Sequence, residues 1–330
     1  MRVLVTGGAG YIGSHTVKEL LRAGYGVTVL DNLSQGHKAV ARLLPQAEFV
    51  WGDIAGRELV TGLLRSRGIE AVLHFAALSL VGESALDPAL YYRNNIVKGL
   101  ALLEAVRDAE VPHFIFSSTA AVYGEPVCVP ITEDHPLAPT NPYGATKLAF
   151  EGALKWYGEA YGLRHLSLRY FNAAGADPDG DLGEDHRPET HLIPAVLQAA
   201  LGLREALTIF GTDYPTPDGT CIRDYIHVTD LAVAHVLALQ ELIGGCPSGA
   251  YNLGSERGAS VREVLETARR VTGREFRVTE GPRRTGDPAV LIASSRRIRE
   301  ELGWRPRYGD LETIIRTAWE WHSRHPQGYR

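Results

Sequence analysis

The amino-acid sequence predicts an α/β protein, in which a doubly wound parallel sheet is followed by a smaller mixed α/β lobe. Three observations predict this fold class. Short β-branched runs alternate with longer helical patterns through the first half, a glycine-rich turn directly follows the first run, and a Gly-, Pro- and Asp-rich stretch after Phe171 interrupts the alternation. Alternating strands and helices are typical of right-handed βαβ units, whose parallel strands are covered by helices on both faces.

The elements of the first half follow from the spacing of apolar residues. Short runs of β-branched and aromatic residues predict strands, and apolar residues recurring at three and four positions predict the helices between them. The expected strands are residues 2–6, 27–30, 48–50, 71–75, 114–117 and 165–169, and the expected helices include residues 11–22 and 94–109.

The second half has a different residue composition, and the change begins with the stretch NAAGADPDGDLGEDHRPET. This composition indicates a long loop and a boundary between lobes. We expect a dinucleotide-binding domain at residues 1–175, with a returning segment near 220–242, and a second lobe at residues 176–330. Further helices are expected at residues 192–203, 229–242 and 260–272, and from residue 311 onward.

Composition excludes several classes of function. The 330 residues carry a net charge of -5, so the chain as a whole has no basic field for binding nucleic acid or an anionic membrane. No apolar run approaches the roughly 18 residues of a membrane span, and no secretory leader is apparent. The three cysteines, Cys128, Cys221 and Cys246, form no CxxC pair, which argues against a disulfide framework or a zinc site. We therefore expect a cytoplasmic protein without a metal.

The glycine-rich turn predicts a dinucleotide site of the Rossmann type. Gly7, Gly10 and Gly13 follow the first expected strand and open the first helix, where backbone N–H groups can approach a pyrophosphate. Asp31 ends the second strand, where a carboxylate accepts hydrogen bonds from ribose hydroxyls and repels a 2′-phosphate. This pair of features favours NAD over NADP. Asp53, after the third strand, either accepts from the adenine amino group or caps the following helix.

A tyrosine and a lysine define the expected reaction centre. Tyr143 and Lys147 lie four residues apart at the start of a helix, so both side chains project from one face. The ammonium is expected to lower the pKa of the phenol and make it a base for a hydroxyl proton. Thr119 follows a central strand and is expected to hydrogen-bond the reacting hydroxyl. The alternatives are a solvated Tyr and Lys pair, and a threonine that caps a turn.

These motifs resemble those of the extended short-chain dehydrogenase/reductases and, more narrowly, of the UDP-glucose 4-epimerase (UDP-galactose 4-epimerase) family. The similarity runs nearly end to end. It includes MRVLVTGGAGYIGSHT at residues 1–16, YYRNN at 91–95, SSTAAVYG at 117–124, PYGATK at 142–147, LRYFN at 168–172, IFGTDY at 209–214, RDYIHV at 223–228 and SRHPQGY at 323–329.

The resemblance implies reversible epimerisation at C4 of UDP-glucose and UDP-galactose, through a transient 4-keto sugar and NADH, by a homodimer. It assigns Tyr143 as base, Lys147 to the nicotinamide ribose and Thr119 to the sugar O4. The implied cofactor contacts are Gly7, Gly10, Tyr11, Ile12, Gly13, Asp31, Asn32, Asp53, Ile54, Phe75, Ala76, Ala77, Asn94, Thr119, Tyr143, Lys147 and Phe171. The implied substrate contacts are Thr119, Tyr143, Asn172, His191, Leu192, Thr208, Ile209, Phe210, Arg223, Arg284, Asp287 and Leu291.

Three positions depart from the family pattern. Ser79 stands where many members carry a lysine, and Thr190-His191 replaces a frequent asparagine pair. Leu291 stands where some members place a large aromatic that closes the pocket against an N-acetyl group. UDP-N-acetylhexosamines are therefore further candidate substrates.

Other activities on the same fold are alternatives. A nucleotide-sugar 4,6-dehydratase needs an added acid and base, but Ala120-Ala121 occupies the places of its acidic pair. A UDP-glucuronate epimerase or decarboxylase stays open, although the second-lobe motifs disfavour it. A non-enzymatic NAD-sensing scaffold is disfavoured because Tyr143 and Lys147 are both present.

Overall fold

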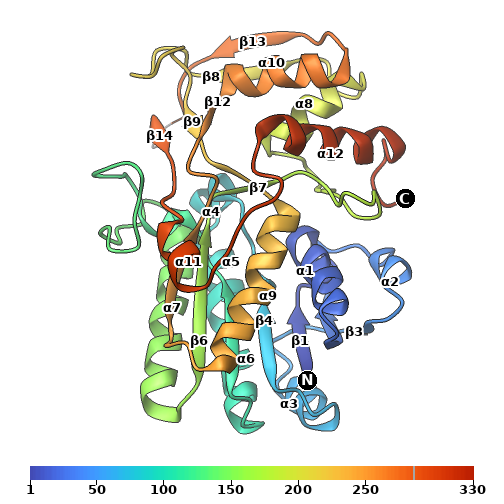
Figure 1. Ribbon diagram of the computed structural model, residues 1–330, viewed down its shortest axis with the longest axis vertical. Coiled ribbons are helices and arrows are strands. Elements are labelled where there is room, and N and C mark those ends of the chain that lie inside the picture. The colour runs from blue at the N-terminus through green and yellow to red at the C-terminus, as the bar shows by residue number, and fades with distance from the viewer. Residues whose placement is uncertain (285–286) are drawn as a thin grey trace.

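A seven-stranded parallel sheet forms the centre of the protein, as the computed structural model, which describes residues 1–284 and 287–330, shows (Figure 1). The strand order is β11-β6-β5-β4-β1-β2-β3, and every neighbouring pair is parallel. This order confirms the predicted doubly wound fold. The strands are β1 (Arg2–Thr6), β2 (Gly26–Asp31), β3 (Glu48–Trp51), β4 (Ala71–His74), β5 (His113–Ser117), β6 (Arg164–Tyr170) and β11 (Gly249–Leu253).

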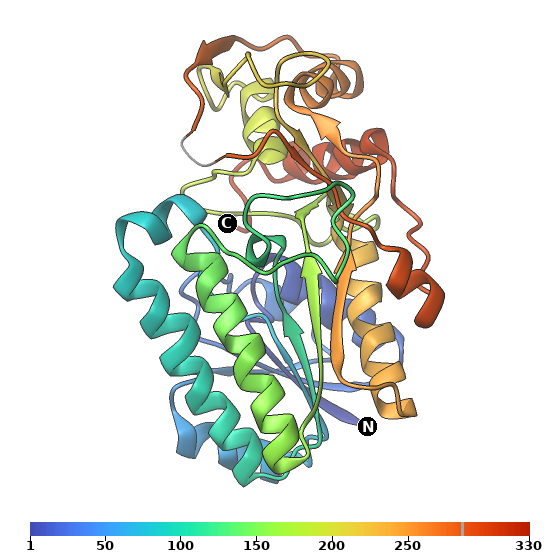
Figure 2. The ribbon, with the colours of Figure 1, turned by 90° about the vertical axis from the view of Figure 1, so that its left-hand side faces the viewer.

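Helices cover both faces of this sheet, and successive strand residues alternate between two apolar cores. In β1, Val3 and Val5 belong to the core under α1 and α9, whereas Leu4 belongs to the core under α3, α6 and α7. Figure 2 shows α6 and α7 side by side on one face, with α9 on the other. The helices are α1 (Tyr11–Arg22), α3 (Arg57–Ser66), α6 (Lys98–Asp108), α7 (Pro142–Tyr161) and α9 (Val228–Gly244).

The chain returns to the first sheet from the second half. Helix α9 packs against α1, and β11 then adds to the sheet edge beside β6, with Tyr251 paired with Leu168. The pattern-based analysis did not predict β11, because a short edge strand has little periodicity of its own. The expected helix at residues 94–109 begins instead as a π-helix (Tyr92–Val97) and continues as α6.

The second lobe has its own apolar core and short strands around it. Val196, Val264 and Ile315 from three different helices are fully buried in this core. Its helices are α8 (Leu192–Ala200), α10 (Val261–Thr272), α11 (Arg296–Glu301) and α12 (Leu311–Arg324). Its strands are β7 (Asn172–Ala174), β8 (Leu207–Phe210), β9 (Ile222–Arg223), β10 (Tyr225–His227), β12 (Ala259–Ser260), β13 (Val278–Gly281) and β14 (Val290–Leu291). The remaining short helices are α2 (Val40–Leu43), α4 (Val81–Leu86), α5 (Pro88–Tyr91) and the 3₁₀ turn η2 (Ala120–Val122).

The topology predicts a ligand crevice at one end of the sheet, where the second lobe lies. The strand order reverses at β1 and β4, and open α/β sheets bind ligands at the carboxyl ends of strands at such a point. Gly7 and Phe75 directly follow these two strands. The second lobe covers this end of the sheet (Figure 1). Among the described residues, no helix is both long enough and apolar enough to cross a membrane.

Candidate active site

The glycine turn after β1 has no room for side chains. Gly7 has a φ of 75°, and a Cβ there would lie 2.7 Å from the backbone nitrogen of Ala76. A Cβ on Gly13 would lie 2.2 Å from the carbonyl oxygen of Gly7. Gly10 precedes α1 without a side chain to cap it, so the first N–H groups of the helix, on Tyr11 and Ile12, remain donors for an anion. The turn therefore fits the pyrophosphate of a dinucleotide.

Asp31 is held in place by backbone donors. It accepts hydrogen bonds from the N–H of Ala9, at 2.9 Å, and from the N–H of Leu33, at 2.8 Å. Burial raises the pKa of this carboxyl, against the lowering effect of these two bonds. Each carboxylate oxygen keeps a further lone pair, which is the geometry that a ribose hydroxyl requires.

Asp53 holds a turn and pairs with a lysine. Its Oδ1 accepts from the N–H of Ala55, at 2.9 Å, while Oδ2 accepts from Lys98 Nζ, at 2.7 Å, and from Asn32 Nδ2, at 2.9 Å. The structure therefore joins Asn32 and Asp53 at the edge of the crevice. Asp53 stabilises the turn before α3, while the cap position of that helix is Gly56.

The segment after β4 forms a wall of the crevice. Phe75, Ala76 and Ala77 are all half-buried, and the Phe75 ring lies 4.8 Å from the His235 ring on α9. The amide of Asn94 in the π-helix donates to the Oδ1 of its neighbour Asn95, at 3.1 Å.

Asn95 is a positioning residue that the sequence analysis missed. Its Oδ1 accepts from the N–H of Leu78, at 2.9 Å, and its Nδ2 donates to Thr146 Oγ1, at 3.1 Å. It thus fixes the loop after β4 to α7. The adjacent asparagines in the YYRNN motif were the signal that could have identified it.

Tyr143 and Lys147 lie at the start of α7, and Lys147 contacts the last residue of β5. Helix α7 begins at Pro142, after Asn141 accepts from the N–H of Gly144 at 2.9 Å. Lys147 Nζ donates to the carbonyl oxygen of Ser117, at 2.8 Å, and lies 5.9 Å from the centroid of the Tyr143 ring. The phenol and the ammonium are both buried, so the alternative of a solvated surface pair is excluded.

The expected lowering of the Tyr143 pKa is wrong when only the side chains of the protein act on the phenol. Burial raises the pKa of Tyr143, and the hydrogen bond with Thr119 opposes this only in part. Burial also lowers the pKa of Lys147 to about 7, against the field of Glu151. Burial disfavours the charged forms of both groups, and this effect on the Tyr143 pKa is larger than the stabilisation of a phenolate by the Lys147 ammonium. A tyrosinate near neutral pH therefore needs a further positive charge at this place.

Thr119 caps a turn beside Tyr143, which is one of the two roles that the sequence left open. Its Oγ1 accepts from the N–H of Ala121, at 3.2 Å, and so caps the 3₁₀ turn η2. Its hydroxyl also acts to lower the pKa of the Tyr143 phenol. A Cβ on Gly144 would lie 2.4 Å from the carbonyl oxygen of Ala121, so glycine allows α7 to approach this turn closely.

Two arginines of the second lobe each contact another candidate substrate residue. Arg223 forms an ion pair with Asp287, and the Arg284 guanidinium lies 4.2 Å above the Phe210 ring. Leu291 pairs with Arg223 in the parallel strands β14 and β9. Thr208 Oγ1 lies 3.1 Å from the hydroxyl of Thr279 on the neighbouring strand.

A small apolar cluster connects the two lobes beside the reaction centre. Leu291 from the second lobe and Phe171 from the end of β6 pack against Val122 and Tyr123, which follow Thr119 in the chain. Asn172 Nδ2 donates to the carbonyl oxygen of Asp224, at 2.9 Å. The structure therefore brings Leu291, Phe171 and Thr119 to one region.

Other predicted contacts are placed differently. The side chains of Ile54 and Ile209 lie in apolar cores, so only their backbone atoms can face a ligand. Leu192 packs against the core of the second lobe. His191 is half-exposed, and its Nδ1 lies 2.5 Å from the carboxylate of Glu184.

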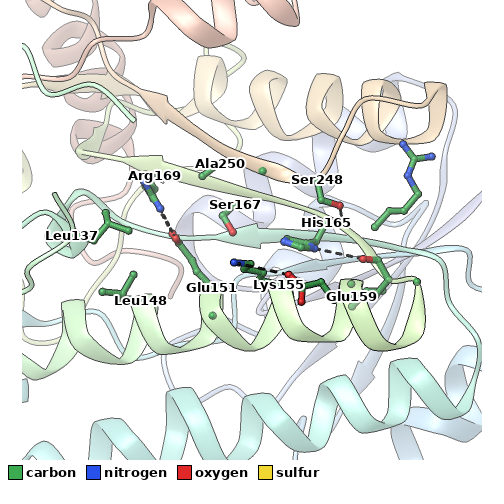
Figure 3. A pocket seen from close by; sticks show the side chains of 16 residues that line it. Leu137, Leu148, Glu151, Lys155, Glu159, His165, Ser167, Arg169, Ser248 and Ala250 are labelled. Atoms are coloured by element: carbon green, nitrogen blue, oxygen red, sulfur yellow. Dashed lines mark hydrogen bonds and ion pairs between the residues drawn. The ribbon is translucent and has the colours of Figure 1, made fainter. Parts of the chain in front are cut away.

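A separate cavity of about 810 Å³ lies between α7 and the strands β6 and β11 (Figure 3). None of its lining residues belongs to the predicted cofactor or substrate set. Glu151 and Arg169 pair across it at 2.6 Å, and Glu151 also accepts from Ser118 Oγ at 2.5 Å. The cavity is therefore lined by a buried ion pair and is not the predicted ligand site. The candidate site remains the predicted crevice at the carboxyl ends of the strands.

Comparison with known proteins places the chain in a family. Residues 3–254 match the NAD dependent epimerase/dehydratase family. A UDP-glucose 4-epimerase from Halalkalibacterium halodurans is 55% identical over 329 residues, covering 100% of this chain and 98% of the relative. A crystal structure of UDP-glucose 4-epimerase superposes with a TM-score of 0.97 at 52% identity, covering 100% of both chains. The UDP-glucose 4-epimerase from Brucella ovis in complex with NAD gives 0.94 at 51% identity, covering 96% of this chain and 97% of that one. The chain therefore belongs to the NAD dependent epimerase/dehydratase family and, within it, to the UDP-glucose 4-epimerases.

Proposed function

We propose that the protein interconverts UDP-glucose and UDP-galactose by reversible epimerisation at C4. The observation that carries the proposal is the convergence of Tyr143, Lys147 and Thr119 beside the glycine turn, at the place where the strand order reverses. NAD, when bound there, supplies a hydride acceptor and a positive charge. The family and the relatives named above support both the cofactor and the reaction.

The protein's own residues handle the proton. The Thr119 hydroxyl acts to lower the pKa of the Tyr143 phenol, so the two hydroxyls are near enough to share contact with the sugar O4. The Tyr143 oxygen takes the O4 proton as hydride leaves C4, which gives a 4-keto sugar, and returns the proton when hydride comes back to the opposite face. Because burial raises the pKa of Tyr143, this residue is a weak acid until a positive charge is close. Lys147 supplies part of that charge and is held by Ser117.

The second lobe grips the nucleotide and leaves the hexose free. Arg223 and Arg284 present guanidinium groups for the diphosphate, where paired N–H donors suit phosphate oxygens. Asp287 orients Arg223, and the Phe210 ring supports Arg284. Leu291 and Phe171 offer apolar contact without direction, so a keto sugar can turn between its two faces.

A homodimer and a cytoplasmic location complete the proposal. Val97, Leu100 and Trp156 are exposed apolar residues of the π-helix, α6 and α7, and an apolar surface of this kind suits contact with a second chain. Light scattering should give twice the mass of one chain, and Val97→Glu should shift it toward one chain. Cys128, Cys221 and Cys246 are all unpaired, as suits a reducing compartment.

The direct test uses purified protein and UDP-galactose, with no NAD added. Chromatography of the nucleotide sugars should show UDP-glucose accumulating, which requires both the reaction and a retained cofactor. No product, even after NAD is added, would contradict the proposal. UDP-glucuronate serves as the parallel substrate, because turnover of it alone would favour the UDP-glucuronate 4-epimerase alternative. Absence of both turnover and bound cofactor would favour the non-enzymatic scaffold.

A further inference from the structure

A compact group of histidines and glutamates lies at the start of α8, outside the proposed proton-transfer centre. Glu184, His186, Glu189 and His191 each present one potential ligand atom, and these four atoms all lie within 4.8 Å of one another. We call this group the Glu-His cluster. All four residues belong to the loop that connects the two lobes.

The spacing of the cluster matches a small coordination sphere. His186 Nδ1 lies 3.2 Å from Glu184 Oε1 and 3.7 Å from Glu189 Oε2. His191 Nδ1 lies 2.5 Å from Glu184 Oε1 and 3.9 Å from Glu189 Oε1. Ligands about 2.0–2.1 Å from a tetrahedral Zn²⁺ are about 3.3–3.4 Å apart. Three of these four separations lie within about 0.6 Å of that value, but the two Glu189 separations involve different oxygens of its carboxylate. Binding an ion would therefore require Glu189 to turn and the His191–Glu184 contact to open.

The cluster is unusually buried for carboxylates. The side chains of Glu184 and Glu189 are 4% and 3% exposed, and buried carboxylates require a cation. Both imidazoles aim the same ring nitrogen at them. The N–H of His191 also donates to Glu189 Oε1, at 2.8 Å, which orients this carboxylate in the way that outer contacts orient metal ligands.

We propose that the Glu-His cluster binds one divalent transition-metal ion, of which Zn²⁺ suits the donor set best. Two imidazole nitrogens disfavour Mg²⁺ and Ca²⁺, which take oxygen ligands. Two carboxylates balance the charge of a divalent ion when both imidazoles are neutral. The expectation of no metal rested on the spacing of the three cysteines, which says nothing about a site formed by histidine and glutamate.

The ion would act as a structural clamp between the lobes. The Tyr11 ring, at the start of α1, lies 6.2 Å from the His186 ring, and the Tyr11 hydroxyl donates to the carbonyl oxygen of Gly175. His37 Nε2 contacts the carbonyl oxygen of Asp185 at 2.7 Å. On the other side, His191 directly precedes α8 of the second lobe. A metal here would fix the start of α8 relative to the glycine turn.

The competing interpretation is a group of ion pairs, in which both imidazoles are protonated. It requires the same residues and the same net charge, so metal binding itself must be measured. The inference is independent of the proposed reaction, and its readouts are metal content and spectra. Failure of epimerisation would therefore leave it untouched.

The experiment uses full-length protein without an affinity tag, stripped with a chelator and dialysed. Titration with CoCl₂ should produce the intense visible absorption of tetrahedral Co²⁺, saturating at one ion per chain, and ZnCl₂ should displace it. Elemental analysis after desalting should find one zinc per chain. His186→Gln should weaken Co²⁺ binding by more than the roughly 10- to 100-fold loss that is typical of outer-sphere variants. His191→Gln, at the more exposed ligand, provides a second variant if His186→Gln folds poorly.

His113→Gln is the matched control, because His113 is a half-buried histidine on β5, outside the cluster, whose Nδ1 contacts the carbonyl oxygen of Glu70. It should keep the wild-type spectrum and stoichiometry. Saturating ZnCl₂ should also raise the melting temperature of the wild type and of His113→Gln, but not of His186→Gln. No metal retained by the wild type would establish the ion-pair interpretation. Equal binding by wild type and both cluster variants would place the ion elsewhere, and either result would overturn the proposal.

Discussion

The two sides of the crevice hold their candidate residues by different means. On the sheet side, Gly13 is enclosed by backbone and Lys147 is 4% exposed, so the geometry is fixed by packing. On the side of the second lobe, Arg284 is exposed and rests on Phe210, which is itself 37% exposed. The difference suits a reaction in which proton and hydride need fixed partners while the sugar must turn. Substitutions on the sheet side should accordingly cause large losses of cofactor retention or kcat. Substitutions on the side of the second lobe should cause smaller, graded changes in KM or substrate range.

The largest effect is expected for Gly13→Ala, which should abolish cofactor retention and activity. A Cβ there would lie 2.2 Å from the Gly7 carbonyl oxygen and 2.9 Å from Gly8 Cα, and neither backbone atom can move without displacing the turn. The measurement is bound NAD per chain, read from the absorbance of protein-free extracts. Gly62→Ala is the control, because Gly62 in α3 has open space around it and alanine favours the helix by about 0.5–1 kcal/mol. Normal NAD content in Gly13→Ala would contradict the packing argument.

Tyr143→Phe should lower kcat by about 10²- to 10⁴-fold, the usual contribution of a positioned base. The phenol is buried, so its loss removes the proton acceptor and leaves the packing of the ring nearly intact. The measurement is turnover of UDP-galactose together with NAD content, which should stay at the wild-type level. Tyr161→Phe, at the exposed end of the same helix, should change neither quantity. Near-normal turnover by Tyr143→Phe would mean that another group is the base.

Arg223→Gln tests the graded side and should raise KM by about 10- to 100-fold, with kcat changed little. A charge-assisted hydrogen bond is worth about 1.5–3 kcal/mol, and the diphosphate contact is made equally in the ground state and the transition state. Steady-state kinetics with UDP-galactose separate the two constants. Arg283→Gln is the control, since Arg283 pairs with the exposed Asp213. A fall in kcat with unchanged KM would place Arg223 at the reacting atoms.

The same contrast explains which parts of the fold could be predicted from the sequence. Strand β1 and helix α1 lie at their predicted residues because regular periodicity and the glycine turn are local signals. Strand β11 was missed because its place in the sheet comes from pairing with β6, far away in the chain. The π-helix before α6 was also missed, since apolar spacing does not distinguish it from an α-helix over so few residues.

Within the site, sequence reasoning identified residue types better than their surroundings. The spacing of Tyr143 and Lys147 predicted their shared location, but the direction of the Tyr143 pKa depends on burial, which spacing does not report. His191 was expected at the substrate because it stands where relatives carry asparagine. Its short contact with Glu184 became visible only once the loop was folded. Long-range environments are thus the part that local patterns omit.

The smallest effect is expected for Leu291→Tyr, which changes substrate range without removing activity. Leu291 packs with Phe171 and Val122 where the lobes meet, and leucine is a smaller residue there than an aromatic would be. Wild-type protein should therefore turn over UDP-N-acetylglucosamine as well as UDP-glucose. The tyrosine should lower kcat/KM for the N-acetylated sugar about 10-fold more than for UDP-glucose, since a misfitting group in an apolar pocket is worth about 1–3 kcal/mol. Leu137→Tyr, at the separate cavity behind α7, should alter neither value. An equal loss of kcat/KM for both sugars would show that Leu291 shapes the whole sugar pocket. Substitutions at the apolar residues of the second lobe would then not be mild and substrate-selective.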